Sequence, residues 1–175
     1  MKQVKLTKNY TTIVDDCDYE RVLTAGPWRA IVRRRKDGSV WNVYAQRDAI
    51  NLNGSPTLQK LHRFILNIND PNIKVDHKNH NGLMNNRENL RVSTQSQNSS
   101  NRQKIKTHAT SSKFKGVAWY KPLQKWRVQI EIGGKKKHLG YFTNELEAAN
   151  VYNLKAKEIF KEFALLNSIK EPENV

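Results

Sequence analysis

The chain has 175 residues, of which 37% are hydrophobic and 27% charged, which is typical of a folded globular protein rather than a disordered one. Its formal net charge of +15 attracts polyanions, so nucleic acid and anionic membrane are the favoured classes of partner. No apolar run approaches the roughly 18 residues of a membrane span, and Cys17, the single cysteine, excludes an internal disulfide and a cysteine-based zinc cluster. No signal-peptide pattern opens the chain, so we expect an intracellular protein without a membrane partner.

The positive charge is spread along the chain rather than collected in a tail. Residues 1–60 contain 11 basic and 6 acidic side chains, residues 61–105 contain 7 and 3, and residues 106–175 contain 13 and 7. A basic tail would instead form a block of like charge. This distribution predicts a protein that contacts nucleic acid over much of its length.

Residues 4–50 are predicted to form short strands. Residues 11–14 are β-prone and are followed by an acidic turn at 15–18. Two β-rich runs, 28–33 and 40–45, flank an Asp-Gly dipeptide, which is a strong hairpin signal. Three arginines, Arg33, Arg34 and Arg35, approach that turn, and a solvated hairpin tip and a phosphate contact are equally good interpretations of them.

A second unit is predicted at residues 61–105. Residues 74–78 have the pattern of a strand that enters a polar loop, Gly82 permits a turn in the loop, and residues 89–93 form the returning strand. Thr94 can then cap a short helix that carries Asn98. A strand, loop, strand and helix in this order would bring residues 76 and 77 close to the helix.

Asp76, His77 and Asn98 together suit phosphodiester hydrolysis. A carboxylate and an amide oxygen are hard ligands, which suit Mg²⁺ or Mn²⁺ better than zinc. Such an ion can bind the scissile phosphate and stabilise the leaving oxygen. A histidine with its usual pKa of about 6.5 can accept a proton from water at neutral pH. By spacing alone, an Asp-His pair in a polar loop is more often a surface turn than a catalytic site.

The C-terminal part is predicted to be a small sheet with one helix. Polar residues 103–112 have the composition of a linker. Three β-rich runs follow at 114–120, 125–132 and 137–142, and Asn144 can begin a helix, with Glu147 as its capping partner.

The motif at residues 75–94 resembles the HNH (ββα-metal) nucleases of bacteriophages and mobile introns. The residues that carry the resemblance are Asp76-His77, Asn79, Asn81-Gly82, Asn86-Arg87 and Glu88-Asn89-Leu90-Arg91. The resemblance implies that His77 is the general base, that Asp76 and Asn98 are metal ligands, and that Asn89 braces the hairpin through backbone hydrogen bonds. His62 also recurs in this branch, as a structural or phosphate-facing residue. A looser similarity to the same branch covers the N-terminal third.

Residues 112–167 resemble the APETALA-type (ethylene-response-factor) DNA-binding domain. The matching residues are Lys115-Gly116-Val117, Trp119, Lys125-Trp126, Ile130, Leu139-Gly140, Phe142, Glu147-Ala148-Ala149, Tyr152, Ala156, Phe160 and Asn167. The resemblance implies a sheet that enters the major groove of DNA, a groove that a β-ribbon can fit. The sequence departs from the plant pattern at Ala118, Glu131 and His138, so the plant recognition sequence should not carry over.

We therefore predict an α+β protein with four parts: a β-rich DNA-contacting region (1–60), an HNH ββα-metal nuclease core (61–105), a linker (106–111) and an APETALA-type DNA-binding domain (112–175). The predicted function is homing-type, Mg²⁺- or Mn²⁺-dependent hydrolysis of duplex DNA by a monomer without a protein partner, in a bacterial or phage-infected host cytoplasm. Two alternatives are a non-catalytic DNA-binding regulator on an HNH scaffold and a protein that binds or cuts RNA.

The residues expected to contact DNA are mostly cationic. For Trp119, as for Trp126, a place in the core is the alternative interpretation. The full set comprises Arg33, Arg34, Arg35, Arg63, Arg87, Arg91, Arg102, Lys115, Trp119, Arg127, Lys135, Lys136 and Lys137.

Overall fold

The computed structural model describes residues 1–51, 53–101 and 111–169, which fall into two compact units, Met1–Ser93 and Thr94–Val175. Both units combine small antiparallel sheets with short helices, so the predicted α+β class is confirmed. None of the helices within the described residues has the length and apolar character that a membrane span requires.

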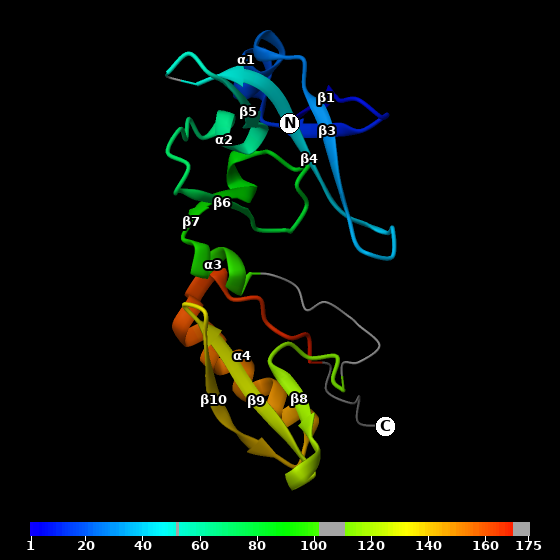
Figure 1. The fold of residues 1–175 in the computed structure, drawn as a ribbon, viewed down its shortest axis with the longest axis vertical. Helices are drawn as coiled ribbons and strands as arrows, with labels where there is room; N and C mark the ends of the chain where they lie inside the picture. Colours follow the sequence, from blue (N-terminus) through cyan, green and yellow to red (C-terminus); the bar gives the residue numbers. More distant parts are fainter. Residues whose placement is uncertain (52, 102–110, 170–175) are drawn as a thin grey trace. The chain divides into compact units, whose positions relative to one another are not determined.

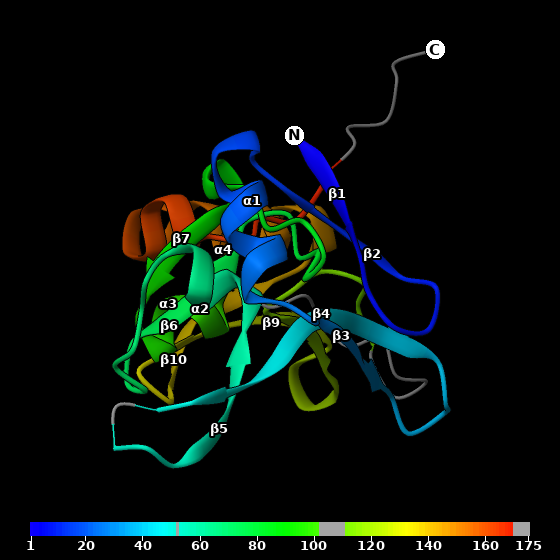
Figure 2. The same ribbon diagram turned by 90° about the horizontal axis from the view of Figure 1, so that it is seen from above.

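The first unit contains three separate sheets (Figure 1). Its elements in chain order are β1 (Lys2–Lys5), β2 (Thr11–Val14), α1 (Asp16–Ala25), β3 (Arg29–Arg34), β4 (Val40–Ile50), β5 (Pro56–Lys60), α2 (Leu61–Ile65), β6 (Lys74–His77), the 3₁₀ helix η1 (Arg87–Asn89) and β7 (Leu90–Ser93). The pairs β1–β2 and β6–β7 are hairpins, and β3, β4 and β5 form a three-stranded sheet with β4 in the centre. Figure 2 shows that the β3–β4 hairpin extends away from the helices of its unit.

One hydrophobic core joins the N-terminal strands to the hairpin that carries the nuclease-like motif. Its buried members come from every part of the unit: Val4, Leu6, Val14, Val22, Trp28, Ala30, Val43, Ala45, Leu61, Ile65 and Leu90. The sequence analysis divides this region after residue 60, whereas the packing makes Met1–Ser93 one unit.

The acidic run at residues 15–18 is not a turn, and that expectation was wrong. Asp16 and Asp18 lie in the first turn of α1, where carboxylates interact favourably with the positive end of the helix dipole. Val22, one turn further along, is fully buried and anchors the helix to the core. The segment has few apolar residues at helical spacing, and its acidic start is typical of a turn, so the sequence pattern does not indicate the helix.

The second unit begins with the helix predicted after Thr94. Its elements are α3 (Gln95–Ser100), β8 (Val117–Tyr120), the 3₁₀ helix η2 (Lys121–Leu123), β9 (Lys125–Ile132), β10 (Lys135–Phe142), α4 (Glu145–Phe160) and the 3₁₀ helix η3 (Lys161–Phe163). The three strands form an antiparallel sheet with β9 in the centre, and α4 packs against it. The expected three strands and one helix are therefore present.

Both expected helix starts in this unit have a side-chain cap. The Thr94 hydroxyl accepts a hydrogen bond from the backbone amide of Gln97, and the side-chain oxygen of Gln97 accepts one from the backbone amide of Thr94. Asn144 accepts from the backbone amides of Leu146 and Glu147. The helix Gln95–Ser100, expected in the nuclease core, packs through Ser100, whose hydroxyl donates to the carbonyl of Phe163 at 3.0 Å. It is thus part of the second unit.

Gly116→Ala should destabilise the second unit far more than Gly134→Ala. Both glycines have a positive φ (+76° and +80°), which costs an L-residue about 1–2 kcal/mol. Only at position 116 would the new methyl group also collide with the ring of Tyr152 and lie 2.7 Å from the carbonyl oxygen of Gln129. Overpacking adds about 1–3 kcal/mol. Urea unfolding of the two variants beside the wild type measures the difference, and equal losses would contradict it.

Candidate active site

Asp76 and His77 lie at the end of β6, in the β6–β7 hairpin. In the strand register Asp76 is opposite Arg91 and His77 is opposite Leu90. Both residues are buried, each with 6% of its surface exposed. This burial argues against the alternative interpretation of the pair as a surface turn.

The loop that follows His77 is held by Asn89. The side-chain oxygen of Asn89 accepts from the backbone amide of Asn79 at 3.1 Å, and its Nδ2 donates to the carbonyl of Met84 at 2.7 Å. Nδ2 also lies 3.0 Å from the side-chain oxygen of Asn79. These contacts close the loop at both ends, so that the end of β6 keeps a defined geometry.

Asn85 orients the imidazole of His77. Its Nδ2 donates to Thr12 Oγ1 at 2.8 Å and to the carbonyl of Gly82 at 3.2 Å. Its Oδ1 therefore faces His77 Nε2, at 3.2 Å. Because an amide oxygen only accepts, Nε2 carries the hydrogen, and in the neutral ring Nδ1 is then the basic nitrogen.

Burial keeps this imidazole neutral. Desolvation lowers the pKa of His77 from its ordinary value, although the hydrogen bond to Asn85 and the charge of Asp76 act in the opposite direction. His62 lies 5.1 Å away between ring centroids, and its pKa is lowered further, first by burial and then by His77, Lys60 and Arg63. Two neutral histidines thus stand together, and Tyr44 lies about 6 Å from both, with centroid distances of 6.0 Å and 6.2 Å.

The N-terminal strands support the loop from its other side. Backbone hydrogen bonds run from Ile13 N to the Leu83 carbonyl at 2.9 Å and from Asn85 N to the Ile13 carbonyl at 2.8 Å. Gly82 packs against β4 so closely that a Cβ there would lie 2.6 Å from the ring of Tyr44 and would collide with the carbonyl of Val43. Residues 1–60, which the sequence analysis expected to contact DNA, therefore also help to form the candidate site.

Asp76 is paired with Arg91. The Nε and Nη2 atoms of Arg91 lie 2.9 Å and 2.7 Å from Asp76 Oδ2, and the two side chains are only 12% and 7% exposed. Arg91, which the sequence analysis assigned to DNA, thus lies at the centre of the candidate site.

The donor groups fit a hard divalent cation that takes few protein ligands. Among the described residues, no three His, Cys, Asp or Glu side chains form a group able to hold a metal. Magnesium commonly takes one or two carboxylates and completes its shell with waters and substrate phosphates. Asp76 would supply one such carboxylate if Arg91 released it, and its role as a ligand stays a prediction. Asn98 lies on α3 of the second unit, and its role as a ligand stays a prediction.

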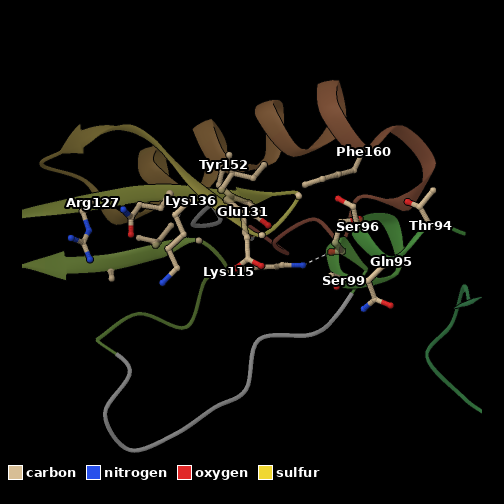
Figure 3. Close-up of a pocket in the computed structure, with 18 of the residues that line it drawn as sticks. Thr94, Gln95, Ser96, Ser99, Lys115, Arg127, Glu131, Lys136, Tyr152 and Phe160 are labelled. Atoms are coloured by element: carbon tan, nitrogen blue, oxygen red, sulfur yellow. Dashed lines mark hydrogen bonds between the residues drawn. The ribbon is translucent and has the colours of Figure 1, made fainter. Parts of the chain in front are cut away.

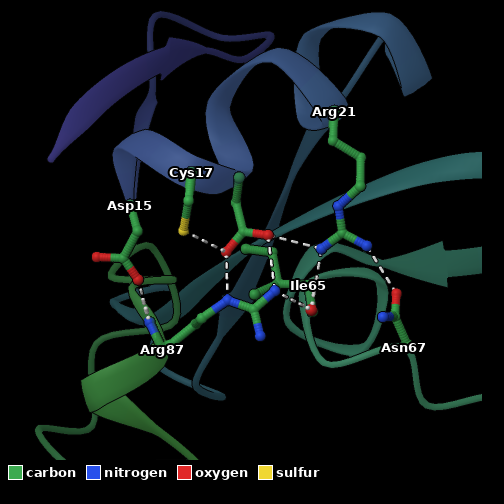
Figure 4. A network of polar contacts seen from close by, with 7 residues as sticks. Asp15, Cys17, Arg21, Ile65, Asn67 and Arg87 are labelled. Atoms are coloured by element: carbon green, nitrogen blue, oxygen red, sulfur yellow. Dashed lines mark hydrogen bonds and ion pairs between the residues drawn. The ribbon is translucent and has the colours of Figure 1, made fainter.

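Arg87, another residue assigned to DNA, joins a polar network (Figure 4). Its Nε and Nη2 donate to the two carboxylate oxygens of Asp18 at 2.7 Å and 2.8 Å, and Nη2 also donates to the Ile65 carbonyl. Arg21 binds the same carboxylate at 2.7 Å. The network connects α1, α2 and η1, so Arg87 has a structural function whether or not DNA approaches it.

The other arginines expected to contact DNA are distributed over the first unit. Arg63 donates to the carbonyls of Ile73 and Asp70. Arg33, Arg34 and Arg35 are all exposed, and Arg34 and Arg35 donate to the tip of their own hairpin. Arg102 lies outside the described residues. The contact of these arginines with DNA stays a prediction.

In the second unit, the sheet face opposite α4 carries a row of aromatic and cationic side chains. Arg127 lies 5.3 Å from the ring of Tyr120, which in turn lies 5.3 Å from the ring of Tyr141. His138 follows at 4.5 Å from Tyr141. Of the four residues in this row, the sequence analysis assigned only Arg127 to DNA, because an alternating strand pattern does not show which face of the sheet the helix covers.

An open groove of about 1120 Å³ lies on this unit, between the sheet and α3 (Figure 3). Lys115 crosses it and donates to the carbonyl of Ser100, while Arg127 and Lys136 line the sheet side. Lys135 and Lys137 are exposed on β10. Trp119 is 38% exposed and contacts Trp126 at a centroid distance of 5.0 Å, with Trp126 against the core.

The sequence analysis missed three residues that organise the site. Asn85 and Asp18 are fully or almost fully buried polar side chains, and Tyr44 packs beside both histidines. Asn85 stands in a run of polar loop residues, which gives no indication of burial. The succession of two asparagines, Asn85 and Asn86, was the available signal.

Comparison with known proteins finds a similar sequence. The chain is 36% identical over 115 residues to a protein of Acanthamoeba polyphaga mimivirus named as an uncharacterized HNH endonuclease, L560. The match covers 63% of this chain and 58% of that protein, so the chain spans somewhat more than half of its relative. No family model and no solved structure matches.

Asp18→Asn should lower the free energy of unfolding by about 2 kcal/mol. Burial alone would raise the pKa of Asp18, but the hydrogen bonds and charges of Arg87 and Arg21 lower it below the ordinary value. The carboxylate therefore stabilises the fold fully above its unfolded pKa of about 3.9, and this contribution disappears as the pH falls through the lower folded-state pKa. Chemical unfolding at pH 7 and at successively lower pH measures both effects.

The exposed Asp16, in the same helical turn, provides the control, and Asp16→Asn should change stability by only a few tenths of a kcal/mol. If the wild type and Asp18→Asn lose stability in parallel as the pH falls, the network does not carry the stabilisation.

Proposed function

We propose that the protein is a metal-dependent endonuclease that hydrolyses phosphodiester bonds in duplex DNA. The observation that carries the proposal is the imidazole of His77, which Asn85 holds in one tautomer beside the carboxylate of Asp76. A neutral, oriented base next to a hard oxygen ligand is what hydrolysis of a phosphodiester requires. The match to a protein named as an HNH endonuclease points to the same reaction class.

The roles follow from the chemistry of each group. His77 accepts a proton from the attacking water through Nδ1, and Asn89 keeps the loop closed around it. Asp76 and Asn98 hold Mg²⁺ or Mn²⁺, which supplies charge stabilisation at the scissile phosphate when it is bound. The low pKa of His77 leaves the imidazole unprotonated at neutral pH, as a base must be.

The second unit is proposed to anchor the DNA. The chain carries a net charge of +15, and the exposed face of the β8–β9–β10 sheet bears Arg127 and Lys136. Cationic side chains on a protein surface contact phosphates chiefly and give an affinity for DNA that decreases with salt. The APETALA-type assignment of this unit and the homing role of the whole protein belong to the proposal.

One observation favours the alternative of a DNA-binding protein without catalysis. Arg91 neutralises the carboxylate that a metal would need, so the hairpin could be a stable scaffold alone. The two functions differ in one measurable property, which is the metal-dependent cutting of DNA.

His77→Ala should abolish cleavage and leave the affinity for DNA nearly unchanged, because the base acts on water and not on the duplex. Loss of a general base slows such a reaction by roughly 10²–10⁴-fold. Single-turnover cleavage and an equilibrium binding assay on the same DNA measure the two properties. His80→Asn is the matched control, since His80 lies in the same loop with a positive φ that asparagine tolerates. Cutting at the wild-type rate by His77→Ala would remove this residue from the mechanism.

Asp76→Ala and Asn98→Ala should each raise the concentration of Mg²⁺ or Mn²⁺ that half-maximal cleavage needs. EDTA should stop cutting by the wild type without releasing the DNA. The control is Asp48→Ala, which removes an exposed carboxylate paired with Arg29 and should leave the metal requirement unchanged. Zinc-supported cleavage that Asn98→Ala does not affect would contradict the ligand assignment.

A further inference from the structure

Arg91 and Asp76 form an ion pair at the position where the proposed metal would bind. They are opposite each other in the β6–β7 register, and two nitrogens of one guanidinium lie within 2.9 Å of a single carboxylate oxygen. With side-chain exposures of 12% and 7%, the pair is largely removed from water. The contact is therefore much stronger than an exposed ion pair and is not screened by salt to the same degree.

A guanidinium and a divalent cation do not share such a carboxylate without a penalty. Both are attracted to the same oxygens, and they repel each other strongly at short distance where little water intervenes. Asp76 therefore binds a metal less tightly while Arg91 retains its present position. Conversely, Arg91 cannot leave without a new anionic partner, because a nearly buried charge without its partner is costly.

A DNA phosphate is the partner that satisfies both conditions. The planar guanidinium matches a phosphate with two parallel hydrogen bonds, as it matches a carboxylate. The same phosphate offers oxygens that complete the coordination of Mg²⁺ or Mn²⁺. The scissile strand would thus draw Arg91 away from Asp76 and release the carboxylate at the moment when the metal is needed.

We propose that Arg91 couples metal binding to DNA binding: in the free protein it neutralises Asp76 and holds the affinity for the metal low, and on the substrate it moves to the phosphate. This inference rests on the proposed function, since it takes Asp76 as a metal ligand. Arg91 is in this scheme a positioning residue, which acts on the metal through Asp76. As a consequence, the protein binds little metal in the absence of DNA, and the metal binds together with the DNA substrate.

Coupling of this kind is reciprocal. DNA should tighten the binding of Mn²⁺ by the same factor by which Mn²⁺ tightens the binding of DNA, and such factors are typically about 5–150-fold. Arg91→Gln keeps a hydrogen-bond donor beside Asp76 but removes the charge. It should tighten Mn²⁺ binding to the free protein about tenfold and reduce the enhancement by DNA toward one. Arg91→Lys, which keeps the charge, should restore part of the coupling.

The experiment measures the dissociation constant of Mn²⁺ for the full chain, from the electron paramagnetic resonance signal of free Mn²⁺, with and without a mixed-sequence DNA duplex at low salt. A His77→Ala background prevents hydrolysis during the titration. Arg29→Gln is the matched control, because it removes one exposed arginine of the same unit, paired with Asp48. It should leave both the affinity for Mn²⁺ and the coupling as they are in the wild type.

The outcomes separate this inference from the proposed function. If Mn²⁺ binds the same way to the wild type and to Asp76→Ala, with and without DNA, the metal assignment itself fails. If binding depends on Asp76 but Arg91→Gln binds Mn²⁺ no more tightly than the wild type, the inference about Arg91 is overturned. Should Arg91→Gln not fold, as judged by circular dichroism, the wild type still decides, because equal affinity for Mn²⁺ with and without DNA would overturn the coupling.

Discussion

The side chain of Asn85 joins three parts of the first unit that are far apart in sequence. Its amide nitrogen binds Thr12 on β2 and the carbonyl of Gly82 in the loop, and its oxygen faces His77 on β6. Because each atom of a buried amide must find a partner, this arrangement admits one orientation of Asn85. That orientation in turn determines which nitrogen of His77 carries the hydrogen, and so the chemistry of the site depends on the N-terminal strands.

Two buried carboxylates have different consequences in this unit. Asp18 is surrounded by Arg21 and Arg87 and by the packing of α1, α2 and η1, and its charge is thereby stabilised as part of the fold. Asp76 has the same kind of partner in Arg91 but lies next to His77. An ion pair that stabilises a fold should keep its partners. An ion pair at a reaction centre can exchange one partner for a ligand. Position, rather than residue type, separates the two.

The second unit uses the two faces of its sheet differently. The face toward α4 buries Val117, Val128 and Ile130 against the helix. The other face presents Arg127 among the rings of Tyr120, Tyr141 and His138, where contact between them holds the rings in a row. Tilted rings in contact and a guanidinium form a polar, cationic surface. Such a surface suits a polyanion better than an apolar partner.

The sequence by itself determined the features that depend on local pattern. Neighbouring residue types predict the β3–β4 turn, the strands β8, β9 and β10, the caps of α3 and α4 and the adjacency of Asp76 and His77. They also carry the resemblance to nucleases, which the mimivirus relative supports. Only the tertiary structure decided that Asp16–Ala25 is a helix, that Arg87 and Arg91 bind Asp18 and Asp76, and that Asn85 orients His77. The physical reason is burial: a polar side chain in a loop has the same appearance in the sequence whether it faces water or a partner more than 60 residues away, and only packing removes the water.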